Sequence, residues 1–342
     1  MWPFALSTRI ITPTKFAMTA SFPTVIELLH ARHANGSVPG ARNDNAKIGL
    51  IIEGGGMRGA VSAGMVAGLE SIGLLHCFDT VYGSSAGTIN GAYFIAGQAR
   101  YCTTIYYQDI NNRTFINLAR LFGDTPALSL EFLLDAVAER IKPLHWDKVI
   151  NSPIPLIAVA SSLIDGRAVA LSSFKSKDDL RECLRASARI PVIAGRPVEH
   201  RGMRLWDALV YEPIPAKTAI EDQCTHILAL LTRPARHARP SFFETHMIAH
   251  LIGRESQDAK SAYLRRTNEY NALVQNLLSG EIEYSGKKAS CLAVQLPPTE
   301  VAIKGTEIDR EALVGAAIAG FKAVYDTLGL TVPQVVEVLT AF

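Results

Sequence analysis

Two glycine-rich segments carry the residues of this chain that could do chemistry. The first is Gly54 to Gly59, and the second, some 25 residues later, is Gly83-Ser84-Ser85-Ala86-Gly87. The second segment matches the GxSxG pattern of a strand-to-helix elbow, which lifts a serine oxygen above the edge of a sheet. Flanking glycines are needed because side chains there would collide with the tight turn. Ser85, at the central position, is therefore the predicted nucleophile, in preference to Ser84.

The first segment can supply the anion-binding groups that acyl transfer requires. Gly54, Gly55 and Gly56 follow the apolar run Ile48 to Ile52 and precede a stretch of helical character. Backbone N–H groups at the start of a helix bind anions, and Arg58 adds positive charge. A serine beside a fixed oxyanion hole is the arrangement that acyl transfer uses. We expect Gly59, Gly83 and Gly87 to support this geometry.

Two aspartates could act as the base that a serine nucleophile needs. Asp165 stands before Gly166 in a hairpin turn signal, which already explains its presence. Asp207, followed by Ala208, comes at the carboxyl end of the expected strand Met203 to Trp206, ahead of a loop broken by two prolines. This position favours Asp207 as the base.

Two other site types compete for the same residues. Gly54, Gly56 and Gly59 match the GxGxxG dinucleotide fingerprint, but that site needs an acidic residue at the end of the second strand, and Asp79 precedes this strand. A Ser–Asp–His triad would need a histidine after Asp207, and the candidates are His226, His237, His246 and His250. His246 and His250 have a spacing that could suit a metal, but they lack the zincin glutamate, and a solvated helix face explains them.

The elements that must position these residues alternate between strand and helix. Short apolar runs predict strands at 48–52, 80–82, 154–162, 167–172, 203–206, 226–231 and 291–296. Helices are expected at 24–34, 60–71, 88–98, 178–188, 310–328 and 332–339. The compact strand–helix–strand unit from residue 48 implies parallel neighbours with a right-handed crossover, so both glycine-rich loops would project from the same sheet edge.

The amino-acid composition disfavours several classes of protein. The chain has 342 residues, of which 48% are apolar and 19% charged, and 34 basic residues nearly cancel 32 acidic ones. Disorder and general nucleic-acid binding are thereby disfavoured. Five scattered cysteines without a CxxC pair argue against disulfides and a zinc cluster, and they favour a reducing compartment. No stretch of about 18 or more uninterrupted apolar residues occurs, so no transmembrane helix is predicted. The expected chemistry implies no metal and no EF-hand loop is present, so neither cofactor nor metal is expected.

Residues 1–46 differ in composition from the rest of the chain. No acidic residue occurs from Met1 to Ile26, while Arg9, Lys15 and many Ser and Thr do. This is the composition of an organelle transit peptide, and a disordered or loosely docked N-terminus is the alternative. We expect a single α/β domain over residues 47–342, with a helical insertion near 236–280.

The combination of these segments resembles the patatin-like phospholipase family of lipid acyl hydrolases. The resemblance rests on Glu53-Gly54-Gly55-Gly56-Met57-Arg58-Gly59, on Gly83-Ser84-Ser85-Ala86-Gly87 and on Asp207-Ala208, and it spans roughly residues 47–230. It implies a three-layer α/β/α patatin-like fold with a mostly parallel central sheet. It also implies Ser85 as nucleophile, Asp207 as base without histidine, and Gly54, Gly55, Gly56 and Arg58 at the oxyanion site. The family's third motif is usually Asp-Gly-Gly or Asp-Gly-Ala, whereas this chain has Leu209 at its third position.

The expected function is release of fatty acids from phospholipids or related glycerolipids. The alternatives are an α/β-hydrolase-type esterase with a Ser–Asp–His triad and a non-catalytic lipid-binding protein with this fold. We expect a cytoplasmic or peripheral membrane location, with organelle targeting by the N-terminal extension as the alternative. The expected partner is a lipid ester substrate, with peripheral contact to a membrane, and not nucleic acid. Basic residues outnumber acidic ones in the helical insertion, and they are Arg233, Arg236, Arg239, Arg254, Lys260, Arg265 and Arg266.

Overall fold

A central mixed sheet organises the computed structural model, which describes residues 23–234, 242–300 and 303–333. In this part of the chain the sheet has nine strands: eight follow the order β5-β6-β3-β2-β1-β7-β9-β8, and the ninth, β4, pairs with β3. The strands are β1 (Ile48–Ile52), β2 (Thr80–Ser84), β3 (Leu156–Ser162), β4 (Arg167–Leu171), β5 (Val198–His200), β6 (Met203–Asp207), β7 (His226–Leu231), β8 (Glu281–Tyr284) and β9 (Lys287–Gln295). The core strands β3, β2, β1, β7 and β9 are parallel, and the remaining strands pair antiparallel at the two sides.

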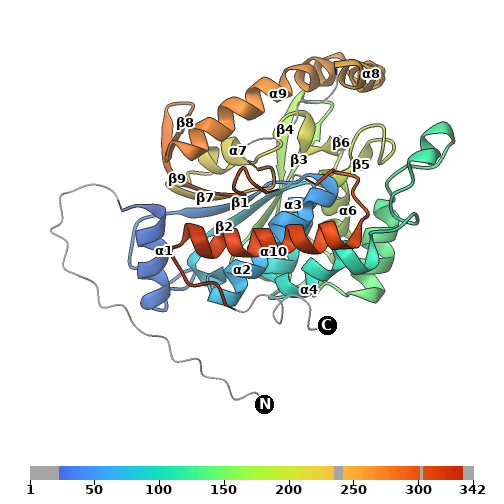
Figure 1. Ribbon diagram of the computed structural model, residues 1–342. Helices are drawn as coiled ribbons and strands as arrows, with labels where there is room; N and C mark the ends of the chain where they lie inside the picture. Colours follow the sequence, from blue (N-terminus) through green and yellow to red (C-terminus); the bar gives the residue numbers. More distant parts are fainter. Residues whose placement is uncertain (1–22, 235–241, 301–302, 334–342) are drawn as a thin grey trace.

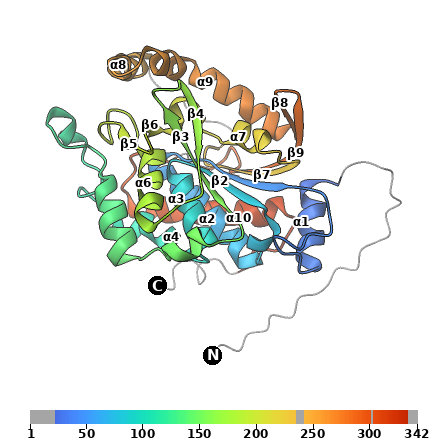
Figure 2. The ribbon, with the colours of Figure 1, turned by 180° about the vertical axis from the view of Figure 1, so that it is seen from behind.

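Helices cover both faces of this sheet (Figures 1 and 2). They are α1 (Val25–Ala34), α2 (Gly59–Ile72), α3 (Ala86–Ile95), α4 (Ala99–Thr104), α5 (Trp146–Ile150), α6 (Lys177–Ala188), α7 (Ala216–Glu221), α8 (Phe242–Gly253), α9 (Gln257–Leu278) and α10 (Arg310–Thr327). Short 3₁₀ turns are η1 (Gly56–Arg58), η2 (Leu75–Cys77), η4 (Leu118–Phe122) and η6 (Ala208–Val210), and π-helical turns are η3 (Ile105–Asp109) and η5 (Phe132–Ile141).

Strand β1 shows why both faces must be covered. All five of its residues are buried, because alternate side chains enter different cores. Leu50 packs into the large core with α2, α3 and α10, whereas Ile51 packs into the smaller core with α7 and α9. The expected α/β/α layering and mostly parallel sheet are confirmed.

The N-terminal helix α1 is packed on the domain. Its Thr24 cap forms a reciprocal capping box with Glu27, and Val25, Leu28 and Leu29 are buried in the large core. The transit-peptide prediction concerns residues that lie mostly outside the described part of the chain, as does the expected helix 332–339. Helices α8 and α9 lie between β7 and β8, where the helical insertion was expected.

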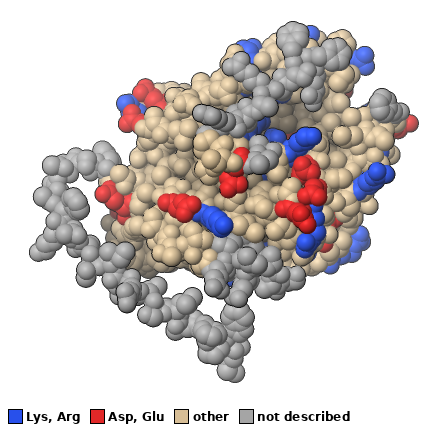
Figure 3. Space-filling view, viewed as in Figure 1, with Lys and Arg blue, Asp and Glu red and all other residues tan. Residues whose placement is uncertain are grey.

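None of the described helices combines the length and the hydropathy that crossing a bilayer would require. Acidic and basic side chains are interspersed over the face seen in Figure 3, in keeping with the nearly balanced charge.

Candidate active site

Ser85 lies at a sharp elbow between β2 and α3. Its φ of 54° and ψ of −129° are a conformation that costs a non-glycine residue about 1–3 kcal/mol. The neighbouring glycines permit this turn: a Cβ on Gly83 would overlap the backbone of Thr88, and one on Gly87 would overlap the carbonyl oxygen of Ile52. The elbow is thus held under strain by close packing, as the GxSxG pattern predicts.

The buried hydroxyl group of Ser187 is hydrogen-bonded to the backbone of the elbow. The Ser85 N–H donates to Oγ of Ser187 over 3.1 Å, and Ser187 in turn donates to the Val159 carbonyl over 2.6 Å. Thr88 shares a hydrogen bond with the same hydroxyl. Sequence reasoning missed Ser187, because a serine in the last turn of α6 carries no local signal of its role.

The glycine loop lies directly against the elbow. A Cβ on Gly54 would stand 2.5 Å from the Cβ of Ser85, so only glycine allows this approach. The Gly54 N–H donates to Oγ of Ser84 over 3.1 Å, and Ser84 donates to the Pro213 carbonyl. Ser84 therefore ties two loops together, and the Gly54 N–H is not free to bind an oxyanion in this arrangement.

The next two residues of the loop present the available donors. Within the described residues, the N–H groups of Gly55 and Gly56 donate no hydrogen bond. A hydrogen bond from the Met57 N–H to the Gly305 carbonyl, over 2.9 Å, joins the loop to the segment before α10. Gly55 and Gly56 have φ values of 148° and 60°, which glycine adopts at no cost. Unpaired N–H groups at the start of η1 and α2 are suited to a developing negative charge.

Asp207 ends β6 beside the elbow, fully buried. Its Oδ1 accepts the Leu209 N–H over 2.8 Å, while Oδ2 has no hydrogen bond of standard geometry among the described residues. Burial raises the pKa of this carboxyl to about 7, and the Ser85 hydroxyl and the Leu209 N–H act to lower it. The carboxyl is therefore within reach of Ser85 and far more basic than an aspartate in water. Because Leu209 contributes only its backbone here, its departure from the family motif leaves this contact intact.

An apolar pocket opens beside Ser85. Apart from Gly56, Ser85 and Tyr106, its lining is aliphatic, aromatic or thiol, and it comprises Met57, Ala86, Ile89, Cys102, Ile105, Ile110, Phe115, Leu128, Leu130, Leu133, Ala188 and Ile190. The Tyr106 hydroxyl is satisfied by Asn90 over 2.9 Å. A lining of this kind favours a hydrocarbon ligand.

Arg58 lies in a charged cluster next to the glycine loop. Desolvation and the nearby Arg233 lower its pKa, while Glu53 and Tyr270 act in the opposite sense. Glu53 accepts the Thr232 N–H over 2.6 Å and faces Arg233 at 3.8 Å. The cluster places the guanidinium groups of Arg58 and Arg233 at the carboxyl edge of the sheet, between β1 and β7. The strand order changes direction at this point, and open α/β sheets bind their ligands at such a point.

The other candidate site residues lie elsewhere. Asp165 is exposed in its turn and accepts the Ser162 hydroxyl. Asp79 stands at the amino end of β2, paired with Arg32 and Arg42, so the ribose contact of the dinucleotide alternative is missing. Asp79 is therefore a structural residue.

Three of the histidine candidates of the triad, His226, His246 and His250, lie in the described part of the chain. His226 opens β7 at the amino edge, where its ring bonds the Pro23 carbonyl and Thr225. His246 and His250 are exposed on α8, and His237 lies outside the described residues. No described histidine is hydrogen-bonded to Asp207.

Comparison with known proteins agrees with this arrangement. The model of the patatin-like phospholipase family matches residues 50–220, which is half of the chain. The chain belongs to the patatin-like phospholipase family. The matched region contains the glycine loop, the elbow and Asp207 of this patatin-like domain, so the predicted resemblance is confirmed.

Individual relatives of this patatin-like domain are distant. The uncharacterized protein YjjU of Escherichia coli K12 is 26% identical over 203 residues, and the match spans 58% of this chain and 56% of that protein. Among solved structures, VipD from Legionella pneumophila has a TM-score of 0.41 at 11% identity, covering 83% of this chain and 66% of that one. Human GIVD cytosolic phospholipase A2 bound to methyl gamma-linolenyl fluorophosphonate and terbium chloride has a TM-score of 0.43 at 11% identity, covering 92% and 62%.

Proposed function

We propose that this protein is a serine acyl hydrolase that releases fatty acids from lipid esters, with Ser85 as nucleophile and Asp207 as base. The observation that carries the proposal is the buried, unusually basic carboxyl of Asp207 beside a strained Ser85. Membership of the patatin-like phospholipase family and the apolar pocket support a lipid acyl chain as the bound group.

In the first half of the reaction, Asp207 accepts the Ser85 proton as Oγ attacks the ester carbonyl. The oxyanion that forms is held by the N–H groups of Gly55 and Gly56, and one such donor contributes about 3–4 kcal/mol to lowering the barrier. Collapse of the intermediate breaks the ester bond, and the protonated Asp207 gives its proton to the leaving alcohol oxygen. The acyl group remains bonded to Ser85.

In the second half, water attacks the acyl-enzyme. Asp207 takes the proton of the attacking water, the same N–H groups hold the second oxyanion, and Ser85 leaves with the proton from Asp207. The fatty acid is released and the carboxylate is restored. One carboxylate thus serves both half-reactions, because its burial places its pKa near neutrality.

The first prediction tests the nucleophile and the base. Ser85→Ala should abolish hydrolysis of a p-nitrophenyl ester and labelling by a fluorophosphonate probe, and Asp207→Asn should reduce turnover by at least about 10²-fold because the proton acceptor is lost. Asp165→Asn is the matched control and should keep turnover, because that carboxyl lies at an exposed turn.

Histidine variants separate the dyad from a triad. Replacing His226, His237, His246 or His250 with Gln should leave appreciable activity in each case. A well-folded histidine variant as inactive as Ser85→Ala would establish a triad instead. No ester turnover by the unaltered protein would favour a lipid-binding protein with this fold.

A further inference from the structure

An arm, residues 111–129, projects from the domain between the π-helical turns η3 and η5 (Figures 1 and 2). The short 3₁₀ helix η4 forms its tip, capped by Asn117, whose side chain accepts the Ala119 N–H. The tip stands away from the sheet and its covering helices, so packing in the core does not explain why the chain has this arm.

Backbone hydrogen bonds join the two legs of the arm at its base. Its two legs are joined by hydrogen bonds from the Asn117 N–H to the Ala127 carbonyl over 2.8 Å and from the Ser129 N–H to the Phe115 carbonyl over 2.9 Å. Ile116 and Leu128 form an antiparallel bridge between the legs. A braced hairpin of this kind holds its tip in a defined position.

The same base forms one wall of the apolar pocket. Phe115 and Leu128 line the pocket together with Ser85, as do Ile110 and Leu130 just outside the arm. Both Phe115 and Leu128 are 4% exposed. The arm therefore connects an outer tip with the space beside the nucleophile.

The tip presents two leucines to solvent. Leu118 is 49% exposed and Leu121 is 45% exposed. They are three residues apart in a 3₁₀ helix, in which side chains at this spacing eclipse one another. The two side chains therefore share one edge of the tip, as in elements that enter a lipid interface.

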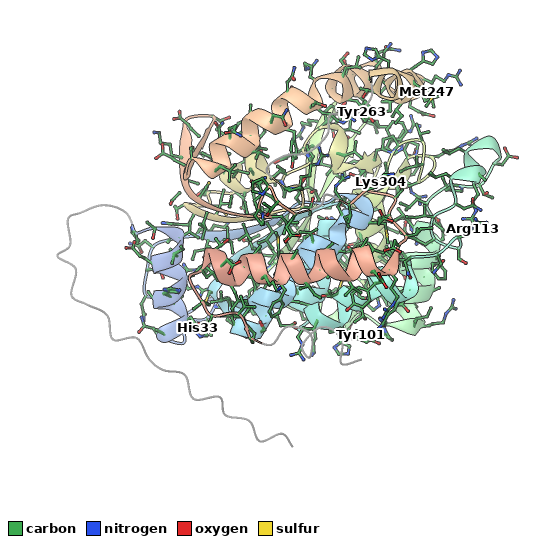
Figure 4. The ribbon with its side chains drawn as sticks, viewed as in Figure 1. His33, Tyr101, Arg113, Met247, Tyr263 and Lys304 are labelled. Carbon is green, nitrogen blue, oxygen red and sulfur yellow. The ribbon has the colours of Figure 1, made fainter. Side chains whose placement is uncertain are left out.

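The charges of the arm favour an anionic surface. Arg113 and Arg120 are its basic residues and Asp124 its only acidic one. Arg113 is exposed and points outward on the side of the molecule opposite α1 (Figure 4), while Arg120 also braces the arm by donating to the Thr114 carbonyl. Because α1 leads into the amino end of β1, the side opposite α1 is that of the carboxyl ends and of Ser85.

The basic helical insertion is a weaker surface for the same partner. Arg233 turns inward to Glu53 and Tyr270, and Arg265 pairs with Glu269. Arg236 and Arg239 lie outside the described residues. Two of its described basic side chains, Arg233 and Arg265, are thus paired with a carboxylate.

We propose that the arm docks on an anionic lipid surface through Leu118 and Leu121, with Arg113 contacting the headgroups. This inference rests on the proposed function. Insertion of the tip would bring the pocket wall formed by Phe115 and Leu128 against the surface. An acyl chain could then pass from the lipid layer to Ser85 along apolar side chains, without crossing water.

The test compares a surface substrate with a soluble one. The double variant Leu118→Ser/Leu121→Ser should sediment less with vesicles of phosphatidylglycerol and phosphatidylcholine, and should hydrolyse their lipids at least about tenfold more slowly, because two apolar anchors are lost. Hydrolysis of p-nitrophenyl butyrate should stay within about twofold, since neither leucine lines the pocket. Arg113→Gln should weaken the preference for phosphatidylglycerol over pure phosphatidylcholine.

The matched control is Val38→Ser, which removes a 44% exposed apolar side chain between α1 and β1, at the opposite edge. It should change neither vesicle binding nor either hydrolysis. Vesicle binding and hydrolysis by the double variant equal to those of the unaltered protein would overturn the inference. Equal loss on soluble and vesicle substrates by a folded double variant would also overturn it, because the arm would then act on the pocket.

Two further outcomes are distinguishable. If light scattering shows a dimer that the double variant abolishes, the tip binds a second copy and not lipid. If the unaltered protein hydrolyses neither substrate, the proposed function fails; the docking inference then stands or falls on vesicle sedimentation, which needs no turnover.

Discussion

Asp207 combines features that rarely occur together in a carboxyl group. It is completely buried, its Oδ1 accepts only a backbone N–H, and the nearby Ser85 hydroxyl is the other group that favours its charged form. No described cation neutralises it, so burial dominates and raises the pKa to about 7. An aspartate in this setting is suited to act as a general base, as histidine does in a triad, because its pKa lies near neutral pH.

The second prediction follows from this pKa. Asp207 must be deprotonated to accept the Ser85 proton, and its raised pKa means that the proton is retained up to about pH 7. The value of kcat/KM on a soluble ester should therefore rise roughly tenfold per pH unit between pH 5 and 6.5 and level off above about pH 8. A profile already flat at pH 5 would show that the base is not this carboxyl.

Glu212 is the control for this profile. Burial also raises its pKa to about 7, but Thr218 satisfies both of its oxygens at the start of α7. Glu212→Gln should therefore leave the midpoint of the pH profile unchanged, which attributes the titration to Asp207.

At the scale of the elements, α2 and α10 are packed unusually close. A Cβ on Gly64 would overlap the carbonyl oxygen of Ala317, and one on Gly320 would overlap that of Val61. Glycine in a helix interior costs stability, so its use here reflects the close backbone approach. Since α2 begins with the glycine loop, this contact helps to hold the loop against the elbow.

The third prediction concerns this helix contact. Gly320→Ala should lower the free energy of unfolding by about 1–3 kcal/mol, because the added methyl group must push two backbones apart. Gly315→Ala, in the same helix, meets nothing within 4 Å and should raise the free energy of unfolding by about 0.5–1 kcal/mol. Urea unfolding measures both values, and a loss of equal size in the two variants would contradict the packing argument.

In the whole molecule, the groups of the candidate site and the contacts that hold α1 on the domain lie at opposite edges of the same sheet. The glycine loop, the elbow and Asp207 lie at the carboxyl ends of β1 and β2 and beside them. At the amino ends, the buried guanidinium of Arg32 binds Asp44 and Asp79, each at 2.7 Å, and the carbonyls of Cys77 and Ala46. This network fastens α1 to the sheet, far from the reacting groups.

The fourth prediction follows from that separation. Arg32→Met should lower the free energy of unfolding by about 3 kcal/mol, because Asp44 loses its ion-pair partner and Asp79 keeps only Arg42, at a place where both carboxylates are partly buried. Its kcat/KM at a temperature where it stays folded should match that of the unaltered protein. Lys288→Met, which breaks an exposed pair with Glu281, should leave the free energy of unfolding almost unchanged. A selective loss of kcat/KM in Arg32→Met would show that the two edges are coupled.

The elements around the site could be predicted from the sequence alone, because their signals are local. The strand 48–52 agrees with β1, and the strand 226–231 agrees with β7. The predicted parallel pairing of the first two strands is confirmed by β1 and β2. These features were readable because apolar runs, glycine turns and the GxSxG elbow are local: each depends on the backbone of a few consecutive residues.

The completion of the site depends on tertiary contacts, which no local pattern in the sequence predicts. It bound the Gly54 N–H to Ser84, left those of Gly55 and Gly56 available, and placed Ser187 beneath the elbow. It also built the pocket from α3, η3, the base of the arm and the segment after α6. Such a pocket has no sequence signature, because an apolar residue has the same local pattern whether it fills a core or lines a cavity. Only the packing of segments that are distant in sequence distinguishes the two.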